Sequence, residues 1–265
     1  MKPTEKTFMK NSFWALSALI IATSCQEEEV VIQQNPETTL SNQLAGSVLW
    51  YQQSDEAAFL YQQAYKRAEE LMLRNLANLQ EGSKVAVVLD IDETVLDNSP
   101  YEARLVMDSV LYKPESWAGW VNEADADTLP GVFKFLKEAE TNGAEVFYIS
   151  NRKESGKEAT IKNLKAFELP YADAEHVLLK TTTSDKTERR NHVLKDFKVL
   201  VYIGDQMTDF TQDYKKVPTD SLMNYFVLLP NPMYGGFEEK IYQGDFDAAT
   251  MDKLDMRKNA LKLKR

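Results

Sequence analysis

Residues 84–94 read KVAVVLDIDET and decide the fold. The first seven residues form an almost continuous apolar run rich in β-branched side chains, which is typical of a parallel strand buried on both faces. Helical patterns, including residues 131–141 and 153–167, follow it. Similar apolar runs recur at residues 144–149, 176–179, 198–203 and 225–229. Strands that alternate with helices predict an α/β fold, a doubly wound and mainly parallel sheet with right-handed crossovers.

Two further helical regions flank this first strand. Residues 43–79 show apolar side chains at helical intervals, and Ser54 offers a break and an N-cap between two packed helices. Residues 99–129 interrupt the alternation with an aromatic and acidic stretch. Because the stretch follows the first strand, we expect a small helical cap over the carboxyl ends of the strands. A peripheral helical pair with its own core is the alternative.

The composition limits the chemistry. The chain has 265 residues, and its 31 basic against 41 acidic side chains give a net charge of −10. This charge disfavours a nucleic-acid polymer as a partner. A single cysteine and two histidines cannot build a four-cysteine or three-histidine zinc site. A metal in this protein should therefore be a hard cation held by oxygen ligands.

The N-terminus is typical of an exported protein. Basic residues precede the apolar run at residues 13–22, and residues 22–25 read ATSC. We interpret residues 1–24 as a signal peptide, Cys25 as a lipidation site and residues 25–42 as a tether. These features predict an outer-membrane lipoprotein of the cell envelope, periplasmic or surface-exposed. The alternative is an ordinary cleaved signal with an incidental cysteine.

Acidic side chains follow the first strand. Asp90 and Asp92 stand two residues apart at its end, so one carboxylate can attack a substrate while the other moves a proton. Carboxylates this close need Mg²⁺ or a lysine to remain ionised at neutral pH.

The second and third strands end in polar and basic residues. Ser150 and Asn151 can hold the oxygens of a phosphoryl group, or one of them can cap the next helix. Lys180 and Lys186 both follow the third strand, and spacing alone does not choose between them. A lysine at this position can neutralise both an acidic nucleophile and a phosphate.

The fourth strand ends in GDQMTDF at residues 204–210. Asp205 is the natural metal ligand there, and Asp209 can bind the metal through water, orient the lysine or cap a helix. Four consecutive strand ends thus present an acid pair, a hydroxyl, a lysine and another acid pair. The shortage of cysteine and histidine favours an aspartyl-phosphate route for phosphate chemistry.

Together these motifs resemble the haloacid dehalogenase superfamily, and more narrowly the class C acid phosphatases, a family of bacterial lipoprotein acid phosphatases and 5′-nucleotidases. The resemblance implies a Rossmann-type fold. The motifs that carry it are residues 48–54 (VLWYQQS), 90–94 (DIDET), 97–101 (DNSPY), 150–152 (SNR), Lys186, 204–210 and 229–236 (LPNPMYGG).

The resemblance also implies roles for individual residues. Asp90 would be the nucleophile, and Asp92 would protonate the leaving group and later activate water. Asp90, the backbone carbonyl of Asp92 and Asp205 would bind Mg²⁺. Ser150 would hold the phosphoryl group, and Lys186 would stabilise both Asp90 and the phosphate. The supporting residues would be Thr94, Asn151 and Asp209.

The implied substrates are nucleoside monophosphates and other small phosphomonoesters. Tyr101, Trp117 and Tyr234 are candidates for stacking on a base, although each can equally pack in the core or at its rim. Gln206 stands where the family usually has Asn, a change that alters loop contacts without removing a ligand. We expect a phosphatase domain over residues 43–265, and the sequence leaves a homodimer open. The alternatives are a surface lipoprotein that only binds phosphorylated ligands, and a phosphotransferase.

Overall fold

The computed structural model describes residues 35–263. The predicted signal peptide, the lipidation site at Cys25 and the first part of the tether lie outside these residues. The last part of the tether prediction is wrong, because α1 (Pro36–Asn42) is a helix that contacts α4 (Ser99–Met107) and α12 (Thr250–Ala260). Asn35 caps this helix by accepting a hydrogen bond from the backbone N–H of Glu37. The folded domain therefore begins before residue 43.

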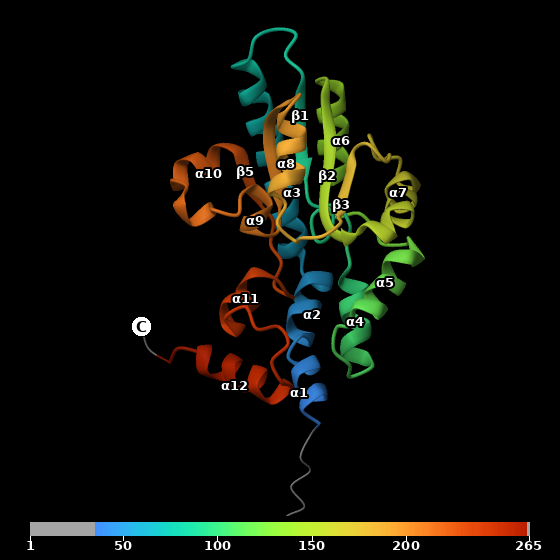
Figure 1. Cartoon of the computed structure of the whole chain (residues 1–265), viewed down its shortest axis with the longest axis vertical. Coiled ribbons are helices and arrows are strands. Elements are labelled where there is room, and N and C mark those ends of the chain that lie inside the picture. The colour runs from blue at the N-terminus through green and yellow to red at the C-terminus, as the bar shows by residue number, and fades with distance from the viewer. Residues whose placement is uncertain (1–34, 264–265) are drawn as a thin grey trace, which may run out of the picture. The chain divides into compact units, whose positions relative to one another are not determined.

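A five-stranded sheet forms the centre of the domain (Figure 1). Every pair of neighbouring strands is parallel, and the order is β3-β2-β1-β4-β5. The central strand β1 is buried along its whole length, as its apolar sequence predicts. The strands are β1 (Val85–Leu89), β2 (Ala144–Lys153), β3 (Val177–Lys180), β4 (Lys198–Gly204) and β5 (Phe226–Leu228). The predicted α/β fold is confirmed.

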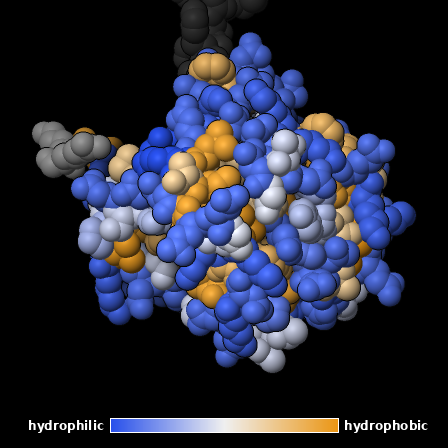
Figure 2. All heavy atoms as spheres, turned by 90° about the horizontal axis from the view of Figure 1, so that it is seen from above, coloured by the Kyte–Doolittle hydropathy of each residue, from blue (hydrophilic) through white to orange (hydrophobic). Residues whose placement is uncertain are grey.

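Helices cover both faces of this sheet. On one face, α3 (Asp55–Ala77) and α6 (Val132–Thr141) pack against β4 and β2, and they bury the larger apolar core. The second face carries a smaller core around Val88, Phe147 and Phe226. The helices that approach it include α8 (Thr187–Leu194) and α10 (Thr219–Tyr225), whereas α7 (Lys157–Ala166) packs its buried Leu164 into the larger core. The surface seen in Figure 2 is mainly hydrophilic, with hydrophobic residues in several areas.

The predicted break at Ser54 is confirmed. Ser54 ends α2 (Ala45–Gln53), and its hydroxyl accepts a hydrogen bond from the backbone N–H of Ala57 in the first turn of α3. The remaining short elements are η1 (Glu154–Gly156), α9 (Met207–Phe210), η2 (Tyr214–Lys216) and α11 (Gly236–Tyr242). Among the described residues, we find no helix with the length and apolarity needed to cross a membrane.

The stretch from residue 99 to 129 contains two helices, α4 and α5 (Pro114–Glu123). α4 packs against α2, and α5 packs against α7. The buried side chains of Tyr101, Leu105 and Trp120 belong to the large core that also contains α3 and β1. The two helices therefore have no separate core, and they lie against the domain beside the strand ends.

Candidate active site

A tight turn places the two aspartates that follow β1. The carbonyl of Ile91 accepts hydrogen bonds from the backbone N–H groups of Val95 and Leu96, and Glu93 adopts the left-handed conformation with φ of 52°. The Glu93 carboxylate accepts a hydrogen bond from the backbone N–H of Asn98 at 2.8 Å. Burial raises the pKa of Glu93 well above its usual range, and the Asp92 charge adds to this effect. These contacts of Ile91 and the buried Glu93 thus fix the turn, and they hold Asp90 and Asp92 at the edge of the sheet.

Lys186 joins the ends of β1 and β4. Its ammonium nitrogen lies 2.7 Å from Oδ1 of Asp90 and 2.6 Å from Oδ1 of Asp209. Burial alone would lower the pKa of Lys186, but the charges of Asp209 and Asp90 outweigh burial and raise it. Burial raises the pKa of Asp90 well above its usual range, and Lys186 only partly opposes this. The buried lysine is therefore charged, and it compensates only part of the negative charge around it.

Asp205 brings a third carboxylate to the same place. Its Oδ2 accepts hydrogen bonds from Gln206 Nε2 at 2.7 Å and from Asn231 Nδ2 at 2.8 Å. Burial, followed by the charge of Asp209, raises the pKa of Asp205 to about 7. One oxygen each of Asp90, Asp205 and Asp209 lies within 4.8 Å of the others. Three crowded carboxylates thus share one lysine.

This crowding fits a hard divalent cation. Such a cation binds oxygen ligands and stabilises carboxylates that burial would otherwise neutralise. Asp209 is the least available of the three, because Lys186 holds its Oδ1 and the backbone N–H of Gln206 binds its Oδ2 at 2.8 Å. Asp209 therefore orients the lysine and closes the first turn of α9, which realises two of the roles considered for it. Asp90 and Asp205 remain as the candidate side-chain ligands for such a cation.

Asp92 lies in a different environment. Arg152 Nε donates to Oδ1 of Asp92 at 2.8 Å, and Asn98 Nδ2 donates to the same oxygen at 2.9 Å. Ser150 Oγ donates to the other oxygen, Oδ2, at 3.1 Å. Hydrogen-bond donors thus fix both carboxylate oxygens. Oδ1 accepts from two donors, whereas Oδ2 accepts from one. We name Arg152 and Asn98 the Asp92 clamp.

Buried partners hold the Asp92 clamp in turn. Only 2% of Arg152 is exposed, and its guanidinium also donates to Thr160 and to the Asn98 side chain. Trp120 Nε1 donates to the same Asn98 oxygen at 2.8 Å. The ring of Trp117 lies 5.8 Å from the Arg152 guanidinium carbon. The helix α5 therefore supports the Asp92 clamp through its two tryptophans.

The structure decides between the residues that spacing left open. Lys186, and not Lys180, reaches Asp90, because Lys186 is the N-cap residue of α8 while Lys180 ends the edge strand β3. Neither Ser150 nor Asn151 caps a helix, since β2 continues to Lys153 and Gly156 stands at the N-cap of α7. Ser150 lies in the site, whereas Asn151 is exposed and accepts a hydrogen bond from Arg189 at 2.8 Å.

The remaining predicted residues differ in position. Thr94 is fully buried, and its hydroxyl has no partner among the described residues. Tyr101 is only 3% exposed and packs edge-on against Trp117, so its ring has no open face for a base. Packing, the alternative considered for Tyr101, is what the structure shows. Trp117 and Tyr234 are half-buried, and their contact with a substrate stays a prediction.

Sequence reasoning gave no role to several residues that hold the site together. Arg152 and Asn98 lie inside quoted motifs, but their partners come from distant segments. Asn231 follows β5 and reaches back to Asp205, and Arg189 fixes the end of β2 by donating to the carbonyl of Ser150. The usable signal was a charged residue, Arg152, within a strand that is otherwise largely buried.

Gln206 joins the loop after β4 to the start of α11. Its Nε2 donates to Asp205, and its Oε1 accepts a hydrogen bond from the backbone N–H of Gly236 at 2.6 Å. A Cβ on Gly235, whose φ is 115°, would lie 2.1 Å from Gln206 Nε2. The longer amide thus fills the space that this glycine leaves open.

Fold and site together define a class of protein. It is an α/β protein with charged groups near the carboxyl ends of its parallel strands: an aspartate beside a buried lysine, a second aspartate held by an arginine, and further acids. Ligand sites of open α/β sheets lie at this edge.

Comparison with known proteins agrees with this class. Residues 9–237 match the family model described as HAD superfamily, subfamily IIIB (acid phosphatase), so the chain belongs to that family. The class C acid phosphatase from Bacillus anthracis is similar in structure, with a TM-score of 0.80 and 38% identity, covering 85% of this chain and 99% of that one. The same protein has also been solved with tungstate bound.

Curated plant proteins show a more partial similarity. Acid phosphatase 1 of Solanum lycopersicum is 30% identical over 156 residues, which cover 56% of this chain and 57% of the relative. Vegetative storage protein 1 of Arabidopsis thaliana is 27% identical over 155 residues, covering 56% of this chain and 54% of the relative. The chain thus spans little more than half the length of these relatives.

Proposed function

We propose that this protein is a Mg²⁺-dependent phosphomonoesterase that forms an aspartyl-phosphate intermediate. The observation that carries the proposal is that two aspartates only two residues apart have different partners. Asp90 contacts the lysine and lies among other acids, whereas Asp92 is held by the clamp of Arg152 and Asn98. These different surroundings support Asp90 as the attacking group and Asp92 as the group that moves a proton.

The proposed metal site uses residues that the fold already brings together. Asp90, Asp205 and the backbone carbonyl of Asp92 would hold Mg²⁺. When bound, the cation would neutralise negative charge on the carboxylates and on the phosphoryl oxygens.

The first chemical step joins Asp90 to phosphorus. A carboxylate oxygen of Asp90 attacks the phosphorus atom, and the bond between phosphorus and the leaving oxygen breaks with its electron pair on that oxygen. Asp92 gives this oxygen a proton from Oδ2, since Arg152 and Asn98 both occupy Oδ1. Lys186 and the hydroxyl of Ser150 stabilise the charge of the phosphoryl oxygens.

The second step releases phosphate. Asp92, now a carboxylate, takes a proton from water as that water attacks phosphorus. The bond between phosphorus and Asp90 breaks, which regenerates the Asp90 carboxylate and frees inorganic phosphate. The clamp keeps Asp92 in one orientation through both steps, so the same oxygen serves as acid and then as base.

We further propose nucleoside monophosphates and other small phosphomonoesters as substrates, with Trp117 and Tyr234 as ring-binding candidates. The proposed location is the cell envelope, where a lipid on Cys25 would anchor the protein to the outer membrane. The similarity to the B. anthracis class C acid phosphatase supports the activity, and the N-terminal sequence supports the location.

A protein that binds phosphorylated ligands without turnover is the second candidate. One relative is called a vegetative storage protein, a name that describes storage and not catalysis. The presence of both Asp90 and the clamped Asp92 favours an enzyme, since a binder needs neither a nucleophile nor a proton carrier. Transfer of the phosphoryl group to an alcohol would share the first step.

The deciding experiment measures phosphate and alcohol released from nucleoside monophosphates and from p-nitrophenyl phosphate, with Mg²⁺ or with EDTA. We expect turnover that requires Mg²⁺ and that Asp90→Asn abolishes. Tight binding without turnover would favour the storage-like alternative. Alcohol released in excess of phosphate, in the presence of an added alcohol, would favour transfer. Activity retained by Asp90→Asn would contradict the aspartyl-phosphate route.

A further inference from the structure

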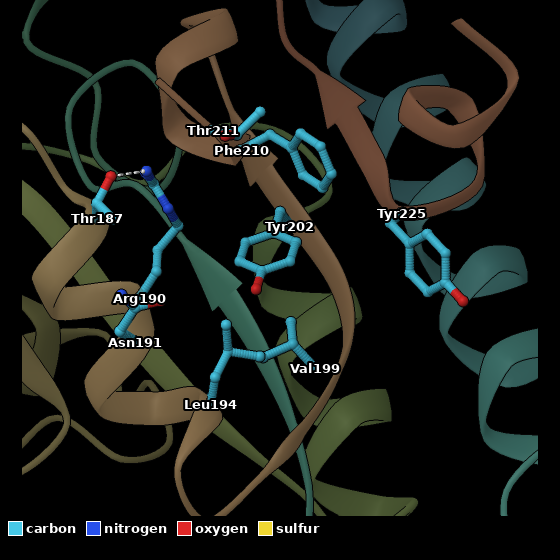
Figure 3. Close-up of a pocket in the computed structure, with 9 residues that line it drawn as sticks. All are labelled: Thr187, Arg190, Asn191, Leu194, Val199, Tyr202, Phe210, Thr211 and Tyr225. Carbon is cyan, nitrogen blue, oxygen red and sulfur yellow. Dashed lines mark hydrogen bonds between the residues drawn. The ribbon is translucent and has the colours of Figure 1, made fainter. Parts of the chain in front are cut away.

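A cavity lies beside α8, the helix that Lys186 precedes. It occupies about 370 Å³ between α8, β4 and the segment from Phe210 to Tyr225 (Figure 3). This volume is in the range of small-molecule sites. The residues that line it are Thr187, Arg190, Asn191, Leu194, Val199, Tyr202, Phe210, Thr211 and Tyr225. None of them takes part in the chemistry proposed above, although Thr187 and Phe210 directly follow Lys186 and Asp209.

Arg190 gives this cavity a buried positive charge. Only 5% of the residue is exposed, and its guanidinium donates to the carbonyls of Thr208 at 2.9 Å and Asp209 at 3.3 Å, and to Thr187 Oγ1 at 3.0 Å. A guanidinium carries five N–H donors, so donors remain. Within residues 35–263, Arg190 forms no ion pair with a carboxylate. A buried charge of this kind favours an anionic partner.

Aromatic side chains form the opposite side of the cavity. Tyr202 is 8% exposed, and its hydroxyl makes no hydrogen bond within the described part of the chain. Phe210 packs edge-on against Tyr202 with ring centroids 5.3 Å apart. Tyr225 is 45% exposed, and in the view of Figure 3 Tyr202 lies between it and Arg190. Aromatic walls of this type suit a flat ring.

The cavity is connected to the catalytic residues through one side chain. Arg190 binds the backbone carbonyl of Asp209, while the Asp209 carboxylate binds Lys186. A ligand that draws the guanidinium toward itself would act on the segment that positions the lysine. The cavity is therefore placed to modulate the proposed reaction without taking part in it.

We propose that this cavity is a second ligand site for a small aromatic carboxylate. The carboxylate pairs with the remaining donors of Arg190, and the ring lies among Tyr202, Phe210 and Tyr225. The binding itself does not depend on the proposed phosphatase activity. Any effect on turnover does rest on that activity, so binding and turnover are measured separately.

The test uses benzoate as the probe, titrated into the full chain and followed by calorimetry. Acetate keeps the charge without the ring, and benzyl alcohol keeps the ring without the charge. We expect each to bind at least about tenfold more weakly than benzoate, because each lacks one of the two matched features. Equal affinity of acetate and benzoate, or no benzoate binding, would overturn the proposal.

Variants then locate the binding. Tyr225→Ala removes an exposed wall of the cavity and should weaken benzoate binding about threefold to tenfold. Tyr214→Ala, a nearby tyrosine that does not line the cavity, is the matched control and should change nothing. Ser150→Ala lies in the catalytic site and should leave benzoate affinity unchanged. If Ser150→Ala weakens binding and Tyr225→Ala does not, benzoate occupies the catalytic site and the proposal is wrong.

Discussion

The two halves of the catalytic edge are built differently. On the side where we propose proton transfer, called the proton-transfer side, Asp92 has the charge of Arg152 beside it and a hydrogen-bond partner for each oxygen. On the side where we propose a metal, called the metal side, Asp90, Asp205 and Asp209 share the single charge of Lys186, and burial raises the pKa of Asp90 and Asp205.

This difference shows that one half is complete without a ligand, whereas the other half favours a bound cation. The protein's own side chains give each oxygen of Asp92 a hydrogen-bond partner, so the position of Asp92 is fixed before a ligand arrives. The metal side retains excess negative charge that a cation can compensate. The predictions below separate these two conditions.

The largest effect is expected from Lys186→Met. It leaves the buried acids on the metal side without their cationic partner, and breaking a buried pair in this way costs about 3–5 kcal/mol of unfolding free energy. Chemical denaturation measures this loss, and turnover should fall with it. Lys180→Met is the control, because that lysine lies on the edge strand outside the site. Equal losses for the two variants would show that Lys186 is not the partner of Asp90.

A smaller effect, on rate, is expected from Arg152→Lys. The variant keeps the charge beside Asp92 but loses the planar group that also holds Asn98 and Thr160. Turnover of glycerol 2-phosphate, whose leaving oxygen needs a proton, should fall about a hundredfold. Turnover of p-nitrophenyl phosphate, which has a good leaving group, should fall much less.

The control for this prediction is Arg104→Lys, which changes an exposed ion pair with Glu123. It should affect neither substrate. An equal loss with both substrates in Arg152→Lys would mean that the arginine does not act through Asp92.

Mg²⁺ should raise the unfolding free energy through the metal side and leave the contacts of Asp92 unchanged. At a concentration one hundred times its dissociation constant, a ligand that binds only the folded state adds about 2.7 kcal/mol. Thermal unfolding with Mg²⁺ and with EDTA measures this difference. Asp205→Asn should remove most of it, whereas Asp213→Asn, which changes an exposed ion pair, should leave it intact. A full Mg²⁺ effect in Asp205→Asn would exclude Asp205 as a ligand.

The smallest effect is expected away from the catalytic edge, at His176. Its ring nitrogens lie 2.8 Å from Asp173 and 3.0 Å from Glu145. Burial by itself lowers the pKa of His176, but these carboxylates outweigh burial and raise it. Because the folded pKa exceeds the ordinary value of about 6.5, the stabilisation is complete below that value and is lost as pH rises through the folded pKa.

We therefore expect His176→Gln to lower the unfolding free energy by about 1–2 kcal/mol at pH 5 and by less at pH 9. Denaturation at the two pH values measures the difference, and activity per folded molecule should not change. A larger loss at pH 9 would contradict the sign of the shift. His176 is thus a reference position, at which a substitution changes stability without changing the catalytic edge.

Much of the architecture was predictable from local patterns. Apolar runs of four to seven residues marked each strand within a few residues of its observed ends, because strands buried on both faces need continuous apolar sequence. The start of the domain was not predictable in this way. Residues 36–42 are polar in composition, and only packing of α1 against α4 and α12 makes them part of the fold.

The reacting residues were predictable for a similar reason. Asp90 and Asp205 directly follow β1 and β4, Asp92 lies two residues after Asp90, and Ser150 lies in the last part of β2. Parallel strands bring their carboxyl ends to one edge. The partners of these residues were not predictable. Asn231 and Arg189 reach the edge from other segments, and the sequence around Arg152 does not indicate that it binds Asp92.

The sequence by itself determined the sheet, the edge that carries the chemistry and the types of residue available there. Only the tertiary structure decided that Lys186 is the lysine beside Asp90, that Tyr101 packs in the core and that Arg152 holds Asp92. The physical reason is that strand patterns are local, whereas the partner of a buried charge is chosen by which distant side chain reaches it with the right geometry.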